Sequence, residues 1–323
     1  MNSKHREITS GDFTSDVLEY YIRKINNLRI DKSKGMAPHK PILLLSIIEL
    51  IEYGKISKNR IYPSPLITST FLKYWSKLSF DKHRANVSLP FFHLKSEGFW
   101  HLHPNKGYEK VLKVTKSIRS FSELRKVINY VSLDDNLFLM LSNKKHREIL
   151  KNRILETYFQ DKRDVLTEIF SETKELEKEQ DELVIESSKK FVPIKEKSLE
   201  VKRKTVFRNT IMSIYDYTCS ICKMQLITLD GESIVDAAHI IPFRHSYNND
   251  IRNGFALCKN HHWCFDKGLI TVDRQYRINV SSLVEDQKFF DDIVHETILL
   301  PRIKKLCPSQ KAFGWHRKNV FQT

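Results

Sequence analysis

The sequence predicts an α+β protein of two domains, the first mainly helical with a small β-hairpin element and the second built from short strands and a helix. The chain has 323 residues, which is too long for one small core and fits two domains. Residues 171–204 are dense in charge and almost free of aromatic side chains, as expected for a charged linker. All five cysteines follow residue 218. We therefore expect domains at residues 1–170 and 205–323, joined by a linker at 171–204.

The first domain is predicted to begin with helices. Residues 14–30 carry apolar side chains at helical spacing. The run at residues 42–53 is apolar almost all round, and Pro41 and Gly54 suit its first turn and its end. A helix that is apolar on every side is normally buried. We expect this one to form the axis of the first domain, with another helix at residues 66–80.

Short strands are predicted in the middle of this domain. The apolar runs 89–94 and 98–102 flank a turn and indicate two strands, and residues 108–115 are a candidate third. Residues 120–170 are expected to be mostly helical. The linker at 171–204 is expected to begin as a solvated helix and to continue as a flexible segment, because its apolar positions do not sustain the heptads of a coiled coil.

The charge of the chain favours a polyanionic partner. The formal net charge is +15, and the sequence pI is about 9.4. No apolar run approaches the roughly 20 residues of a membrane span, and the N-terminus lacks the apolar core of a secretory signal. We therefore expect a cytoplasmic protein that binds nucleic acid rather than a membrane.

The cysteine spacing predicts a metal site. Cys219 and Cys222 form a CxxC pair, and Cys258 and His261 repeat that spacing further along the chain. Two such pairs complete a tetrahedral Cys3His site, which is typical of structural zinc, whereas a lone CxxC could equally serve redox chemistry. Cys264 is expected to be a core thiol.

Three more polar residues surround this motif. His239 ends a predicted strand at residues 233–238, and Asn253 precedes a second strand at 255–257. His262 lies next to His261 at the start of a predicted helix, where consecutive side chains point about 100° apart. The two histidines can therefore face different surfaces. Asp266 lies one turn after His262, so it could ligate a divalent ion or simply pair within the helix.

This order of strand, loop, strand and helix resembles the HNH nucleases, with their ββα-metal fold, over about residues 219–273. The variant is similar to the HNH domains of McrA-like restriction enzymes that cut modified DNA. The resemblance implies that His239 is the general base, that Asn253 orients the loop, and that His262 binds a catalytic Mg²⁺ or Mn²⁺. Many family members carry an aspartate directly before the base, where this chain has Ala238. Both Asp236 and Asp266 therefore stay open as the acidic ligand.

Two motifs of the first domain resemble the sulfur-binding domain of phosphorothioate-dependent HNH restriction enzymes. One covers residues 37–41 and the other residues 89–100. The resemblance implies a pocket for a phosphorothioate, in which sulfur replaces a non-bridging phosphate oxygen. Sulfur is larger and more weakly hydrated than oxygen, so an apolar wall can accept it.

Specific residues are expected to form this pocket. Leu89, Pro90 and Phe91 could form the apolar wall, and His39 with Lys40 the cationic edge. The same motif contains His93. Lys82, His83 and Arg84 could follow the DNA backbone. The alternative is structural: His39 and Lys40 would only flank a helix, and Phe91 would be core.

The sequence therefore predicts a DNA endonuclease of the restriction type, and we expect its partner to be double-stranded DNA that carries a modification. Recognition of methylated or hydroxymethylated cytosine, recognition of plain sequence as in homing nucleases, and a non-catalytic zinc-dependent DNA-binding protein are the alternatives. One HNH site cleaves one strand, so double-strand cutting would need a homodimer or two binding events.

Overall fold

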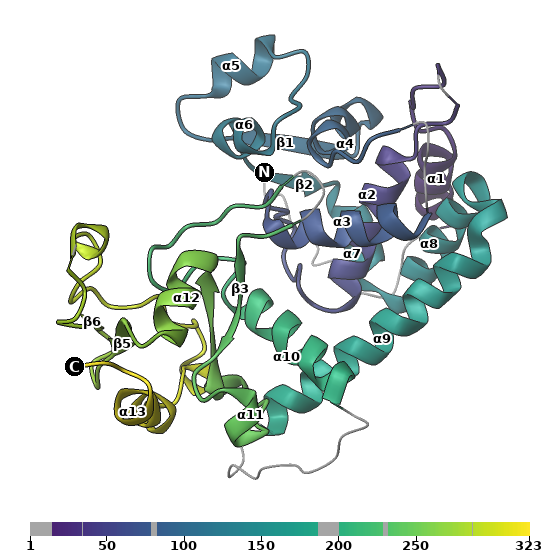
Figure 1. Cartoon of the computed structure of the whole chain (residues 1–323). Helices are drawn as coiled ribbons and strands as arrows, with labels where there is room; N and C mark the ends of the chain where they lie inside the picture. The colour runs from purple at the N-terminus through teal and green to yellow at the C-terminus, as the bar shows by residue number, and fades with distance from the viewer. Residues whose placement is uncertain (1–14, 34, 79–82, 187–199, 229–231, 286) are drawn as a thin grey trace, which may run out of the picture. The chain divides into compact units, whose positions relative to one another are not determined.

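The computed structural model describes residues 15–33, 35–78, 83–186, 200–228, 232–285 and 287–323 (Figure 1). The chain divides into two compact units, Met1–Phe170 and Ser171–Thr323, each with a hydrophobic core of its own. Helices predominate and every sheet has two strands, so the α+β prediction is confirmed. Within the described residues, no helix is both long enough and apolar enough to span a membrane.

The first unit is organised around helix α2, His39–Glu52. Every residue from Lys40 to Ile51 is buried, as its apolar sequence predicts. Gly54 follows with φ of +68°, a conformation that glycine adopts without strain and that ends the helix. The other long helices of this unit are α1 (Ser15–Asn26), α3 (Pro65–Leu78), α7 (Asp135–Ser142) and α8 (Lys144–Tyr158). Helix α9 (Arg163–Glu186) begins in this unit and continues into the second.

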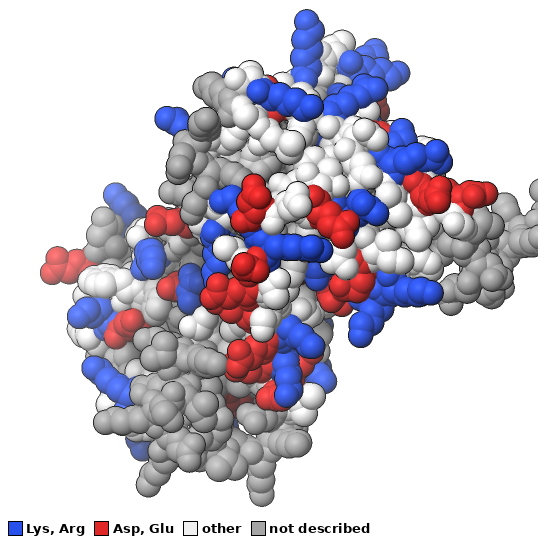
Figure 2. Space-filling view, turned by 90° about the vertical axis from the view of Figure 1, so that its right-hand side faces the viewer, with Lys and Arg blue, Asp and Glu red and all other residues white. Residues whose placement is uncertain are grey.

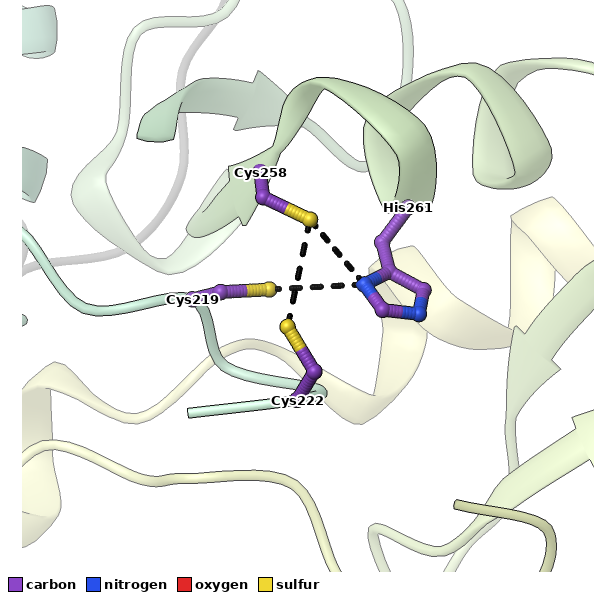
Figure 3. Close-up of side chains that lie close together, drawn as sticks. All are labelled: Cys219, Cys222, Cys258 and His261. Atoms are coloured by element: carbon purple, nitrogen blue, oxygen red, sulfur yellow. Dashed lines mark hydrogen bonds between the residues drawn. The ribbon is translucent and has the colours of Figure 1, made fainter. Parts of the chain in front are cut away.

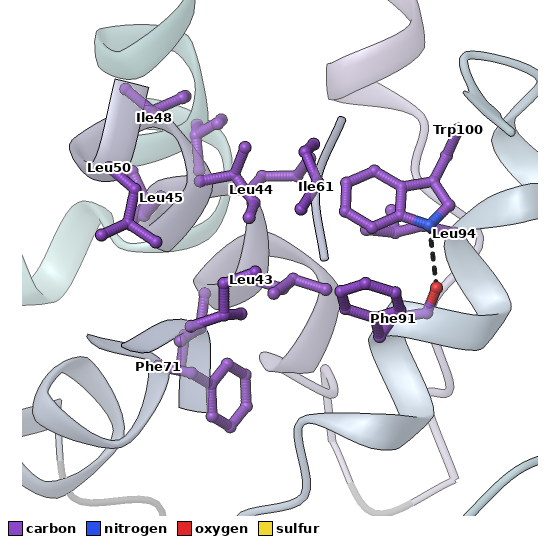
Figure 4. Close-up of a cluster of buried hydrophobic side chains, with 14 of the residues drawn as sticks. Leu43, Leu44, Leu45, Ile48, Leu50, Ile61, Phe71, Phe91, Leu94 and Trp100 are labelled. Carbon is purple, nitrogen blue, oxygen red and sulfur yellow. Dashed lines mark hydrogen bonds between the residues drawn. The ribbon is translucent and has the colours of Figure 1, made fainter. Parts of the chain in front are cut away.

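The predicted hairpin of residues 89–102 is wrong in its first half. Residues Ser88–His93 form helix α4, followed by the 3-10 helix Leu94–Glu97. Helix α4 buries Phe91 against Trp100, with ring centroids 5.4 Å apart, and the Trp100 indole donates a 2.8 Å hydrogen bond to the Phe91 carbonyl (Figure 4). A short apolar run fits a strand or a buried helix equally well, so its periodicity could not decide.

The sheet of the first unit joins distant segments. Strand β1, Trp100–Pro104, pairs antiparallel with β2, Ile128–Leu133, which lies inside the stretch expected to be helical. The intervening chain forms α5 (Glu109–Val114) and α6 (Phe121–Val127). The candidate third strand at 108–115 is therefore also wrong. The strand partner of β1 lies more than twenty residues away, beyond the reach of a local sequence pattern.

The second unit contains the predicted strand–loop–strand–helix order. Strand β3 (Val235–His239) pairs antiparallel with β4 (Gly254–Cys258), and α12 (Lys259–Asp266) follows directly (Figure 1). Helix α10 (Glu200–Ile214) packs on this hairpin. The remaining elements are α11 (Phe243–Ser246), the 3-10 turn Ile251–Asn253, β5 (Ile270–Val272), β6 (Ile278–Val280) and α13 (Gln310–Asn319).

His316 attaches helix α13 to the rest of this unit. Its ring is 1% exposed and stacks on Phe265, with centroids 3.7 Å apart. Its Nδ1 lies 2.9 Å from the Thr271 hydroxyl, and its Nε2 lies 3.0 Å from the Phe265 carbonyl oxygen. Burial lowers the pKa of His316 to about 4.

We predict that the second unit loses stability as the pH falls from about 6.5 towards 4. An unfolded histidine binds a proton near pH 6.5, whereas the folded His316 resists protonation until about pH 4. The free energy of unfolding falls by about 3 kcal/mol once the pH is below both pKa values. Thermal melting of the wild type and of His316→Gln across this range would test it. The variant should be less stable at neutral pH but should show a flatter pH dependence, and equal slopes would contradict the prediction.

Candidate functional site

Four ligand-type side chains of the second unit converge as the spacing predicted. Cys219 and Cys222 lie in the turn after α10, Cys258 ends β4, and His261 lies in the first turn of α12 (Figure 3). Their ligand atoms all lie within 4.8 Å of one another. His261 Nδ1 is 3.1 Å from the Cys258 sulfur and 3.7 Å from the Cys219 sulfur. This Cys3His group could hold a metal ion, and no other group of three or more such ligands occurs in the described residues.

The protons in this cluster are shared unequally. Hydrogen bonds with Cys219 and Cys222 hold the pKa of Cys258 well below its usual value, while hydrogen bonds with the other two thiols raise the pKa of Cys219. Burial opposes the charged form of His261, but the neighbouring thiols outweigh burial and raise its pKa to about 9. Metal ligands must be deprotonated, so an ion bound here would displace the protons that Cys219 and His261 otherwise hold.

His239, at the end of β3, is held on two sides. Its ring stacks on Phe207 of α10, with centroids 4.0 Å apart and planes 11° apart. Its Nε2 lies 3.0 Å from Oδ1 of Asn249, an atom that can only accept, so Nε2 is the donor of this hydrogen bond. Sequence reasoning missed both neighbours. Asn249 lies in an irregular loop and Phe207 on a helix more than twenty residues upstream, so no local pattern marked them.

Asn253 closes the loop between the two strands. It is 2% exposed, accepts a 2.9 Å hydrogen bond from the Ile241 amide and donates to the carbonyls of Ile241 and Asn248 at 3.0 and 3.2 Å. The next residue must be glycine, because a Cβ on Gly254 would clash with the Phe207 ring. Asn253 and Gly254 together fix the loop that carries Asn249.

The two candidate acids are in different environments. Asp266 lies one helical turn after His262, with its Oδ2 3.6 Å from the His262 Nε2. Asp236 instead pairs with Arg208 at 2.7 Å and with Lys259 at 3.8 Å. Asp236 is also three positions from His239 on one strand, so the two side chains leave opposite faces. The structure thus brings Asp266, and not Asp236, beside a predicted metal-binding residue.

In the first unit, Lys40 does not lie at a surface edge as expected. It is 7% exposed and forms an ion pair with Glu97, which is 5% exposed. The same ammonium donates to the Arg29 carbonyl at 2.7 Å and to the Ser96 hydroxyl at 3.2 Å. Lys40 therefore joins the start of α2 to the segment after α4.

The expected apolar wall is also partly withdrawn from the surface. Phe91 is fully buried and Pro90 is buried, so of the three expected residues only Leu89 is half-exposed. Helix α4 buries most of its residues, among them Pro90 and Phe91, and this leaves little of the expected wall at the surface. Phe91 and Pro90 are therefore not exposed as a surface wall.

The histidines and Arg84 stay closer to the surface. The His39 ring packs against Trp75 in a tilted arrangement, with centroids 4.6 Å apart, and its Nε2 donates to the Arg84 carbonyl at 2.9 Å. Burial lowers the pKa of His39. His93 lies 3.2 Å from the Ser117 hydroxyl, and burial followed by the charge of Lys40 lowers its pKa. Both imidazoles are therefore neutral at pH 7. The Arg84 side chain is exposed, and Lys82 lies outside the described residues.

Figure 2 draws the charged side chains on one face of the molecule. On the face drawn in Figure 2, Lys and Arg side chains gather towards the top of the view, whereas acidic and basic side chains alternate across the middle.

The ββα arrangement with its Cys3His group defines the class of the second unit. Residues 219–273 match the family model of the HNH endonucleases, so the protein carries an HNH nuclease domain, as the sequence predicted. Residues 19–170 match the model of the ScoMcrA-like DNA sulfur-binding domain. The chain thus carries a region that matches the HNH endonucleases after a region that matches a DNA sulfur-binding domain.

Comparison with individual proteins adds little. No curated protein matches the chain. One similar solved structure is described as a modification dependent TagI restriction endonuclease. The identity is 16% and the TM-score 0.29, and the match covers 35% of this chain and 37% of that one.

We predict that Lys40 contributes to folding of the first unit. Lys40→Ala leaves the buried Glu97 carboxylate without a counter-charge, and removal of one partner of a buried pair costs about 3–5 kcal/mol. Urea unfolding would measure the loss. The matched double variant Lys40→Met/Glu97→Gln should recover most of it. As a control, Arg84→Ala, at an exposed position, should change stability little. An unaltered unfolding midpoint for Lys40→Ala would contradict the buried pair.

Proposed function

We propose that this protein is a restriction-type endonuclease that recognises phosphorothioated DNA with its first unit and hydrolyses phosphodiester bonds with its HNH domain. The observation that carries the proposal is the pairing of two matches in one chain, a DNA sulfur-binding domain over residues 19–170 and an HNH nuclease over 219–273. An HNH site contacts mainly the DNA backbone, so a separate domain must supply the choice of target.

The surface around α4 is our candidate for the sulfur pocket. Its half-buried members are Leu89, His39 and His93, and Arg84 lies exposed nearby. The imidazoles are neutral at pH 7, and apolar packing lies beneath them. Such a surface favours a weakly hydrated sulfur over a strongly hydrated oxygen, and Arg84 offsets the phosphate charge.

In the HNH domain, we assign His239 as the general base. The hydrogen bond between Nε2 and Asn249 fixes the orientation of the imidazole, which can then accept a proton from the attacking water. Phe207 limits rotation of the ring through stacking, and Asn253 holds the loop on which Asn249 lies. The base is thus oriented before DNA binds, which lowers the entropic cost of the reaction.

We assign His262 and Asp266 to hold the catalytic divalent ion. The pair supplies one nitrogen and one carboxylate ligand from adjacent turns of α12, and water and DNA phosphate oxygens can complete the shell. When bound, Mg²⁺ or Mn²⁺ supplies Lewis-acid stabilisation of the phosphate charge and of the leaving 3′ oxygen. Asp236 is assigned a structural role, because Arg208 and Lys259 already neutralise it.

The Cys3His group is assigned to structural zinc. Three sulfurs and one imidazole nitrogen form a closed set with no position left for water or substrate. Bound zinc would hold the turn after α10 to the junction of β4 and α12. Since one HNH site cleaves one strand, a homodimer would supply the second site for a double-strand break.

The function predicts a specific cleavage pattern. With Mg²⁺ or Mn²⁺, the protein should cut a phosphorothioated duplex and should leave the same duplex without sulfur largely intact. His239→Ala should lower cleavage by at least about a hundredfold while DNA binding persists, because proton transfer typically contributes roughly 10²–10⁴-fold. Gel assays with both duplexes would measure this. Equal cutting of the two duplexes would remove sulfur recognition, and full activity of His239→Ala would remove the assigned base.

The metal assignment predicts a second result. Cys222→Ser should lose the bound zinc and lower the melting temperature of the second unit, because metal binding is coupled to folding. Cys307→Ser is a matched control, because Cys307 lies outside the cluster. This variant should retain one zinc per chain. Metal analysis by mass spectrometry together with calorimetry would test both. Retention of zinc by Cys222→Ser would overturn the ligand set.

A further inference from the structure

One face of helix α12 takes no part in the proposed metal sites, although its Lys259 also pairs with Asp236 at 3.8 Å. Lys259 and Trp263 of α12 and Lys267, which caps the C-terminus of the helix, follow one another at intervals of four residues, so they form a single stripe along this side. All three are exposed: Trp263 is 58% exposed, and the Lys259 side chain is 65% exposed. We call these three residues the Trp263 stripe.

Packing of the second unit does not explain Trp263. The inward face of α12 is formed by the buried residues His261, Cys264 and Phe265. Trp75 and Trp100 are 9% and 1% exposed, as is usual for so large an apolar ring, and Trp315 is half-buried. An exposed indole between two cations is instead characteristic of a binding surface, where tryptophan is enriched.

The stripe lies next to the proposed catalytic residues. His262 precedes Trp263 directly, and the face that carries His262 and Asp266 is rotated from the stripe by about 100°. The Cα atoms of Lys259 and Lys267 are eight residues apart, or about 12 Å along the helix axis. A DNA strand whose phosphate reaches His262 would therefore pass beside two cations and an aromatic ring.

We propose that the Trp263 stripe is a docking surface for the DNA duplex at the point of cleavage. Lys259 and Lys267 contact phosphates on either side of the scissile bond, and Trp263 packs on sugar and base edges between them. The positive charge of the stripe complements a polyanion. Because the stripe lies beside His262, we take that polyanion to be the DNA substrate. This inference rests on the proposed nuclease function. It assigns part of the grip on DNA to the HNH domain, independent of the sulfur pocket.

Tryptophan fluorescence tests the contact directly. Trp263 is the most exposed tryptophan of the described residues, so acrylamide should quench it preferentially. Addition of phosphorothioated duplex without a divalent ion should protect the wild type from quenching. Trp263→Phe should show little DNA-dependent change. Equal quenching of the wild type with and without bound DNA would overturn the proposal.

Kinetics separate docking from catalysis. Trp263→Ala should raise KM roughly fivefold or more, since an aromatic contact with a base contributes about 1–3 kcal/mol, and kcat should change little. Trp263→Phe should recover part of the loss. Leu283→Ala is the matched control, because Leu283 is 61% exposed but lies away from α12 in sequence and should leave KM unchanged. An unaltered KM for Trp263→Ala, or a loss in kcat alone, would contradict docking.

Salt dependence tests the cations. Lys267→Gln should reduce the slope of log affinity against log salt by about 0.9, the value for one phosphate contact. Arg274→Gln, which removes an exposed cation from the turn between β5 and β6, should leave the slope unchanged. Equal slopes for Lys267→Gln and the wild type would remove the phosphate contact. If bound DNA protects Trp263 of the wild type from quenching but is not cut, the proposed nuclease function is wrong and the docking surface is still supported.

Discussion

The cluster of Cys219, Cys222, Cys258 and His261 is the interaction on which the nuclease domain depends. It joins the turn after α10, the end of β4 and the start of α12 in one buried group. The positions of the proposed catalytic residues follow from that junction. His262 is adjacent to a cluster member, and β4 pairs with the strand that ends in His239. A metal in this cluster would stabilise the site without taking part in its chemistry.

The second constraint is the contact of α10 with the β3–β4 hairpin. Phe207 lies so close to Gly254 that a side chain there would clash, and the same ring stacks on His239. Together with the hydrogen bonds of Asn249 and Asn253, this contact leaves the imidazole little freedom. Packing on one side and loop hydrogen bonds on the other fix the orientation of the His239 imidazole, which suits a general base.

In the first unit, burial separates structural residues from those able to meet DNA. Lys40 and Phe91 belong to motifs that resemble a sulfur-binding domain, yet one forms a buried ion pair and the other packs against Trp100. Their part in recognition would be to support His39, Leu89 and His93. The same division applies in α12, where alternate faces of one short helix serve the core, the proposed metal ion and the proposed DNA contact.

The sequence by itself determined the HNH motif, the four members of the cluster and the buried helix α2, because each depends on residue type and short spacing. It could not determine whether residues 88–93 form a strand or a helix, since a short apolar run satisfies either. It also missed β2, Phe207 and Asn249, and could not decide between Asp236 and Asp266. Those outcomes depend on which distant segments pack together, and only the tertiary structure brings Arg208 to Asp236 and Phe207 to His239.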